Sequence, residues 1–412
     1  MALAPRRRAR RVFAYWRSEK RTLRQGFFAL LVSTAAALVA GITTASIVKT
    51  LLLLPSLYIL LPAATGMRGT IFGAIGARLG TNSAAGVFEV SRRRSGVLYQ
   101  NVFTGIVTTF SSSLYLAALA RFSAAIFGLR SISFLDFVTI SVVGGLLGSA
   151  VILLLTVGLS VVSFRRGYDL DTVSTPLVTA SGDMVTIPTL YLATFLVHNQ
   201  VVNAVVASIC IIVCLYATIR RALTDLPVAR RAIFEMVGVI LLTPLLDILA
   251  GTVVEPHLAS LHEFPALVAI IAPLVSDAGA LGGILSSRLS SKLHLGVISP
   301  RGRPEGPAYL DASLVMGFGI VAFAAVGTLG YVYSLVAGRS PGPVVMIGGT
   351  LLAGFFSILI SIVFSYYIAV LTYRFGLDPD NQSVPIITSV MDLAGVLSFF
   401  LVLAILGMTG HG

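Results

Sequence analysis

Long apolar runs constrain this chain more than any other feature of its sequence. They follow one another with only short connections, and a helix of about 20 apolar residues can span a bilayer. Only 11% of the 412 residues are charged, whereas soluble domains carry about 25%. We therefore predict an all-α polytopic membrane protein. Its 11 predicted spans are 27–48, 52–76, 97–120, 134–163, 173–197, 201–219, 233–254, 266–287, 309–336, 344–371 and 383–408.

Two blocks of the sequence occur twice at a nearly constant offset. Gly69–Thr81 aligns with Gly279–Ser291, 210 residues further on. Asp169–Pro176 aligns with Asp378–Pro385 at an offset of 209, and in both copies an aspartate follows the proline by seven residues. Apolar helices resemble one another by chance, but chance does not reproduce these polar positions. The chain is therefore predicted to contain an internal repeat.

Each copy of the repeat contains five predicted spans, and the extra span at 201–219 restores the chain direction between them. The two halves should then be parallel, related by a pseudo-twofold axis along the membrane normal. A path for a solute is expected on that axis, and a monomer is expected because one chain supplies both halves. The predicted parts are a basic cytoplasmic arm (1–25), a first five-helix repeat (26–197), a linker transmembrane helix (198–231) and a second five-helix repeat (232–412).

The positive charge indicates membrane orientation rather than a nucleic-acid partner. The formal net charge is +12, and 26 of the 29 basic residues are arginines clustered between spans. Placing the N-terminus in the cytoplasm puts most clusters on the inner side, as the positive-inside rule requires. We expect a multi-pass protein of the plasma membrane with its C-terminus outside. The basic arm should meet anionic lipid headgroups.

Asp183 and Asp392 are the central candidates for chemistry. Each is an ionisable residue in an otherwise apolar span, and such residues usually face a cavity or a partner. Two symmetric carboxylates near one axis suit Mg²⁺, which prefers oxygen ligands. The alternative is a structural role, with each aspartate neutral or paired with a buried arginine.

Residues at the inner ends of the same spans extend this candidate metal site. Their acidic members either concentrate cations at an inner mouth or cap the helices, and the two roles are compatible. The candidate ligands beyond the two aspartates are Asp171, Asp380, Asn381, Pro176, Pro385 and Thr175.

Two further sets of residues bear on the path. Small residues in the second span of each half either allow close helix packing or mark broken helices beside a substrate. Asp247 and Asp277 are unmatched in the other half, so they either hold a coupling ion such as Na⁺ or form a salt bridge with Arg68. The candidate pore or packing residues are Gly66, Gly69, Thr70, Gly279 and Ala280.

These blocks together resemble the membrane domains of MgtE-type magnesium transporters. The resemblance rests on Pro62…Gly66-Met-Arg-Gly69…Arg78-Leu, its copy from Pro273 to Leu289, and the two Asp-x-Asp…Pro…Asp blocks. The fused two-repeat form is similar to solute carrier family 41. The resemblance implies a Mg²⁺ path in which Asp183 and Asp392 contact the ion. It also implies Asn at two positions that hold Thr70 and Ala280 here.

Two other functions were weighed. An intramembrane aspartyl protease requires Tyr-Asp and Gly-x-Gly-Asp contexts, whereas this chain has Ser-Gly-Asp183 and Val-Met-Asp392, so we do not expect an enzyme. A carrier of an anion or organic solute is supported by Arg68 in a span. The leading prediction is a divalent-cation transporter or channel, with Mg²⁺ as the ion and Na⁺ coupling left open.

Overall fold

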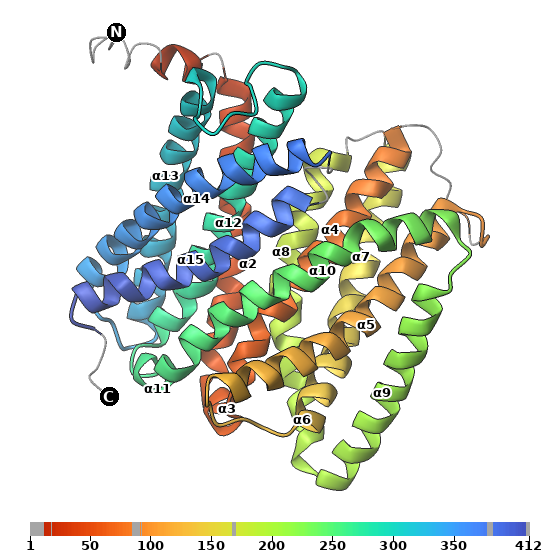
Figure 1. Ribbon diagram of the computed structural model, residues 1–412. Coiled ribbons are helices and arrows are strands. Elements are labelled where there is room, and N and C mark those ends of the chain that lie inside the picture. The colour runs from red at the N-terminus through yellow and green to blue at the C-terminus, as the bar shows by residue number, and fades with distance from the viewer. Residues whose placement is uncertain are drawn as a thin grey trace. The chain divides into compact units, whose positions relative to one another are not determined.

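The structure is a computed structural model that describes residues 12–17, 19–84, 91, 93–166, 170–376 and 382–408 (Figure 1). Within these residues every regular element is a helix, and ten helices are long and apolar enough to cross a membrane. The predicted span 173–197 corresponds to α8 (Leu170–Thr194), whose first half has side chains outside the described part. The prediction of an all-α polytopic membrane protein is confirmed.

The remaining long helices follow the predicted spans closely. Those of the first half are α2 (Lys20–Ser46), α4 (Leu57–Ala84), α5 (Val97–Ile126), α7 (Gly145–Arg166) and α9 (Gln200–Ala222). Those of the second half are α10 (Pro227–Val254), α12 (Pro265–His294), α13 (Gly306–Val336), α14 (Thr350–Arg374) and α15 (Val384–Ile405).

Short elements interrupt some spans that were predicted to be continuous. Span 134–163 consists of α6 (Phe134–Thr139), the π-helix η1 (Ile140–Gly144) and α7, and a second π-helix, η4 (Val344–Gly349), precedes α14. The other short elements are α3 (Val48–Leu53), η2 (Phe195–His198), η3 (Glu255–His257) and α11 (Leu258–Leu261).

The chain divides into two compact units that do not follow the order of the repeats. The central unit is Val39–Ala269, and the C-terminal unit combines Met1–Leu38 with Ile270–Gly412. The first helix of the second repeat, α10, therefore packs in the central unit against α4 of the first repeat. In the C-terminal unit, the described first part of α2 contacts α12 and α13 of the second repeat.

Glycines make these helix crossings close. A Cβ on Gly251 of α10 would lie 2.7 Å from Ile59 Cα of α4. At the corresponding place, 210 residues earlier, a Cβ on Gly41 of α2 would overlap the carbonyl of Ala269 on α12. Only glycine lets two backbones approach this closely, so the repeat preserves a packing contact as well as polar residues.

The linker helix α9 is attached to the central unit by a polar network near its start. Thr139 Oγ1 donates to Asn203 Oδ1 at 2.5 Å, and Asn203 Nδ2 donates to Asp136 Oδ1 at 2.6 Å. Asp136 also completes a capping box with Ser133 at the start of α6. Much of the rest of α9 exposes apolar side chains such as Ile212, as a lipid-facing helix does.

Within the N-terminal arm (1–25), residues 12–17 form a helix that packs on α13 in the C-terminal unit. Tyr15 Oη donates to Asp311 Oδ1 at 2.5 Å. Trp16 Nε1 donates to Ser313 Oγ at 3.3 Å, and its ring lies over Gly317, where a Cβ would be 2.5 Å from the ring. The arm is thus anchored to the protein by at least these side chains.

Candidate cation site

Asp183 lies on α8 beside the contact between α8 and α4. The preceding residue, Gly182, faces α4 so closely that a Cβ on it would lie 3.8 Å from the backbone nitrogen of Gly69. Thr70 follows Gly69 and is half-buried, as is Asp183 itself. The candidate pair Gly69 and Thr70 is therefore brought to the helix that carries Asp183.

Asp392 lies on α15, the corresponding helix of the second repeat. Pro385 is in the first turn of α15, where a missing N–H costs nothing, and Asp392 follows seven residues later on the same helix face. Asp392 is half-buried and has a side-chain or backbone partner of its own. Thr372 and Ser383 hydroxyls lie 2.9 Å apart and connect the entry to α15 with α14.

The glycines of the second repeat pack α12 against α15. A Cβ on Gly279 would meet Thr388 at 3.4 Å, which is ordinary contact, whereas a Cβ on Gly282 would lie 2.8 Å from Ile387 Cγ1. Gly283 is similarly close to Val384. Ala280 beside them is half-buried. Each repeat thus places its aspartate-bearing helix against its small-residue helix.

The inner-end ligand candidates lie largely outside the described part of the chain. Asp171, Thr175 and Pro176 fall in α8, but their side chains are outside the described residues, and so are Asp380 and Asn381 altogether. In the part that is described, no three His, Cys, Asp or Glu side chains converge. Among the predicted acidic ligands, the structure therefore describes Asp183 in the central unit and Asp392 in the C-terminal unit, each within its own unit.

Asp247 and Asp277 are fully buried, each at a crossing between a first and a second helix. In the central unit, Asp247 of α10 lies against Gly66 of α4, where a Cβ would be 2.8 Å from its Oδ2. In the C-terminal unit, Asp277 Oδ2 of α12 accepts from Thr34 Oγ1 of α2 at 2.8 Å. Arg68 lies in the central unit among residues of α5 and α7, and none of the salt bridges between described residues includes it.

The sequence interpretation missed a charged cluster at the C-terminal end of α12. Asp311 of α13 is fully buried and pairs with Arg288 Nε at 2.9 Å and Lys292 Nζ at 2.5 Å. Arg288 also contacts Glu19, next to the N-terminal arm, at 3.3 Å. The signal was available, since two bases four residues apart on one helix face precede an acid at the start of the next span.

Comparison with known proteins identifies the family. The family model MgtE, described as a divalent cation transporter, matches residues 61–194 and 271–402. Solute carrier family 41 member 3 of Mus musculus is 22% identical over 370 residues, covering 83% of this chain and 74% of that protein. The Rattus norvegicus protein of the same name is 21% identical over 359 residues, covering 82% and 76%.

Among solved structures, the crystal structure of the eukaryotic MATE transporter AtDTX14 matches over 95% of this chain and 96% of that chain. The identity is 12% and the TM-score is 0.39, a likeness too low to show a shared fold.

The two segments that match the family model correspond to helices two to five of each repeat. One runs from α4 to α8 and the other from α12 to α15, and their starts are 210 residues apart. Together they take up more than half of the 412 residues. This chain therefore belongs to the MgtE family of divalent cation transporters.

Proposed function

We propose that the transported ion is Mg²⁺, and that it crosses the membrane between the two repeats on their pseudo-twofold axis, in contact with Asp183 and Asp392. One observation carries the proposal: Asp183 and Asp392 are both half-buried, and each follows a proline by seven residues at the corresponding position of a largely apolar helix. A carboxylate within a span is costly unless it meets a cavity, water or a cation.

The chemistry of the two positions suits a hard cation. Mg²⁺ prefers oxygen ligands, dehydrates reluctantly and keeps several waters when one or two carboxylates bind it. Two carboxylates from two homologous halves match that preference. Asp171, Asp380, Asn381 and Thr175, with the chain around Pro176 and Pro385, would add oxygens at the cytoplasmic end.

The proposed setting is the plasma membrane, with the N-terminus in the cytoplasm. The arginine clusters support this orientation, because an inverted protein would carry them outside. The buried Asp247 and Asp277 are proposed to serve Na⁺ coupling, since two carboxylates without a repeat counterpart are the natural place for a second ion.

The site assignment is tested by Mg²⁺ flux into proteoliposomes loaded with a Mg²⁺-sensitive dye. Asp183→Asn and Asp392→Asn should each reduce flux by about tenfold or more, because a lost charged ligand is worth at least about 1.4 kcal/mol. Asp225→Asn is the control, since this aspartate is exposed in the α9–α10 connection. Undiminished flux in the Asp183→Asn, Asp392→Asn double variant would refute the assignment.

Coupling is tested in the same vesicles with opposed Na⁺ gradients. If Na⁺ is exchanged, reversing its gradient should reverse the net Mg²⁺ flux, and Asp277→Asn should abolish that dependence while leaving flux down a Mg²⁺ gradient. If Mg²⁺ flux through the wild type does not depend on the Na⁺ gradient, Na⁺ coupling is ruled out. That result would not affect the assignment of Asp183 and Asp392 as Mg²⁺ ligands.

A further inference from the structure

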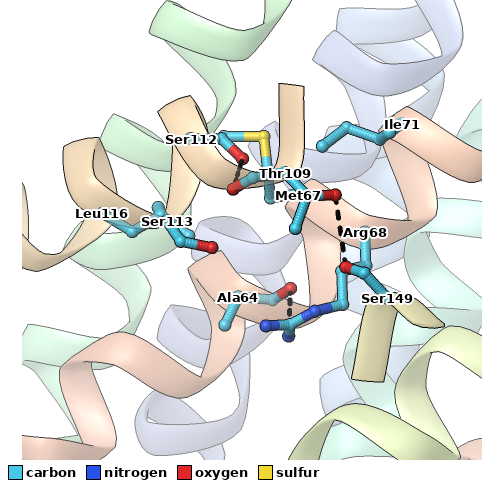
Figure 2. Close-up of a pocket in the computed structure, with 9 residues that line it drawn as sticks. All are labelled: Ala64, Met67, Arg68, Ile71, Thr109, Ser112, Ser113, Leu116 and Ser149. Carbon is cyan, nitrogen blue, oxygen red and sulfur yellow. Dashed lines mark hydrogen bonds between the residues drawn. The ribbon is translucent and has the colours of Figure 1, made fainter. Parts of the chain in front are cut away.

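A small cavity lies in the central unit between α4, α5 and α7 (Figure 2). Arg68 of α4 and four hydroxyl residues of α5 and α7 line it together with apolar side chains. The hydroxyl residues are Thr109, Ser112, Ser113 and Ser149. The cavity has room for about one water-sized particle.

Arg68 is a buried cation with too few partners. Arg68 is only 4% exposed. In the described part of the chain it makes one hydrogen bond, which Nη1 donates to the Ala64 carbonyl at 3.0 Å. Nε has no hydrogen-bond partner there, and none of the salt bridges between described residues includes Arg68. A guanidinium remains charged in proteins, and an isolated buried charge costs several kcal/mol unless it meets an opposite charge.

Two glycines of α7 allow the guanidinium to pack directly against the backbone of that helix. A Cβ on Gly145 would lie 3.1 Å from Arg68 Nη2 and 2.6 Å from Ser113 Oγ. A Cβ on Gly148 would lie 3.5 Å from Arg68 Nε. The Arg68 head therefore lies between a glycine-lined wall and hydroxyls that can rotate to donate hydrogen bonds.

The second repeat provides an internal comparison, because the same place there is apolar. In the central unit Thr109 Oγ1 donates to Ser149 Oγ at 3.3 Å, whereas the corresponding contact in the C-terminal unit joins Gly319 to the Ile358 side chain. The Phe323 ring, 1% exposed, covers Gly354 where Ser113 faces Gly145. In pairs that give the residue of the first repeat and then its counterpart in the second, the corresponding residues are Arg68 and Ala278, Thr109 and Gly319, Ser113 and Phe323, Gly145 and Gly354, and Ser149 and Ile358.

From this asymmetry we propose that the cavity at Arg68 is a binding site for a small inorganic anion, and we choose chloride as the probe. The anion would accept hydrogen bonds from Arg68 and from the hydroxyls of Ser113 and Ser149. The cavity is too small for phosphate, sulfate or an organic acid. This site belongs to the first repeat alone and includes none of the proposed cation ligands.

The proposal is tested by thermal unfolding of the full chain in detergent. Chloride is titrated against gluconate at constant ionic strength, so that only specific binding moves the midpoint. A ligand that binds the folded state raises the midpoint saturably, by roughly a few degrees at a hundredfold excess over Kd. Bromide should reproduce the shift and give an anomalous peak beside Arg68 in crystals, whereas sulfate should not raise the midpoint.

Three variants decide the assignment. Arg68→Gln should lose the chloride response, and Arg231→Gln, which removes an exposed arginine, should keep it. The double variant Arg68→Ala, Ser113→Phe introduces the apolar pair of the second repeat, so it should fold and should also lack the response. Equal chloride shifts in wild type and both Arg68 variants, or none in the wild type, would overturn the proposal. These measurements do not depend on Mg²⁺ transport.

Discussion

At the scale of single residues, Thr34 shows how a buried carboxylate is held in a span. Its Oγ1 lies 2.8 Å from Asp277 Oδ2 and 2.9 Å from the Leu30 carbonyl, although a hydroxyl has only one hydrogen to donate. The other oxygen of Asp277, Oδ1, is buried without a hydrogen-bond partner in the described part of the chain. Thr34 is therefore the chief polar contact of a fully buried acid.

Replacing Thr34 by valine should destabilise the protein for this reason. The substitution keeps the shape of the side chain but leaves Asp277 without its hydroxyl contact, which costs about 1–3 kcal/mol of unfolding free energy. Thr34→Ser retains the hydroxyl and should cost much less. Thermal unfolding in detergent gives the difference. A valine variant as stable as the serine variant would show that the contact contributes nothing.

At the scale of elements, close helix crossings depend on glycines that sequence patterns alone do not distinguish. Helix α10 contains Gly238 and Gly251, both embedded in apolar sequence. A Cβ at Gly238 would meet nothing within 4 Å, whereas one at Gly251 would meet the backbone of Ile59 at 2.7 Å. Only the second glycine is required by packing.

The two glycines of α10 should therefore respond oppositely to alanine. Gly251→Ala must separate α10 from α4 and should cost about 1–3 kcal/mol, as overpacking does. Gly238→Ala should be neutral or stabilising by up to about 1 kcal/mol, because alanine is the better helix former. Their unfolding midpoints, measured side by side, test the crossing. Equal midpoints would mean that the helices do not approach this closely.

The N-terminal arm is a second element whose position can be measured. Partial burial, and then the neighbouring Asp311 carboxylate, raise the pKa of Tyr15 above its ordinary value, with Arg288 acting in the opposite direction. When the pKa of a group is higher in the folded protein than in the unfolded chain, its protonated form stabilises the folded protein. This stabilisation is complete at pH values below the pKa of the unfolded chain, and it is lost as the pH rises through the pKa of the folded protein. The docked arm should thus be insensitive to pH near neutrality and weaken in alkali.

Trp16 is the single tryptophan of the chain, so its fluorescence reports arm docking directly. Emission should remain constant from neutral pH to about 9 and shift to the red above about 10, where tyrosine ionises. Lys292 also contacts Tyr15, so Tyr15→Phe, which removes only the phenol hydroxyl, is the control. That variant should lack the tyrosine-linked step. An identical alkaline transition in both proteins would show that Tyr15 is not its source.

At the scale of the whole molecule, the helical spans and the repeat could be predicted because apolar length and repeated polar residues are local signals. The interruptions η1 and η4 could not be predicted, because π-turns inside apolar runs have no distinctive composition. The packing partners of α2 and α10 could not be predicted either, because an apolar helix does not indicate which neighbours it packs against. At the candidate site, Asp183 and Asp392 are predicted from the cost of a carboxylate in lipid, and their role stays a prediction. The Arg68 cavity depends on hydroxyls from two other helices, so it required the structure.

Helix α10 packs in the central unit and the first part of α2 packs in the C-terminal unit. This arrangement predicts how the protein behaves when its chain is cut between α9 and α10. A break at Thr224, in the α9–α10 connection, separates residues 1–224 from 225–412. Each compact unit then needs helices from both fragments: the central unit needs α10, and the C-terminal unit needs α2. Co-expressed fragments should co-purify as one folded species, whereas either fragment alone should aggregate in detergent, as size-exclusion profiles would reveal. Adding Gly251→Ala to the second fragment should weaken the association, while Gly238→Ala should leave it intact. A fragment that is monodisperse alone would show that the repeats, rather than the exchanged units, are the folding domains.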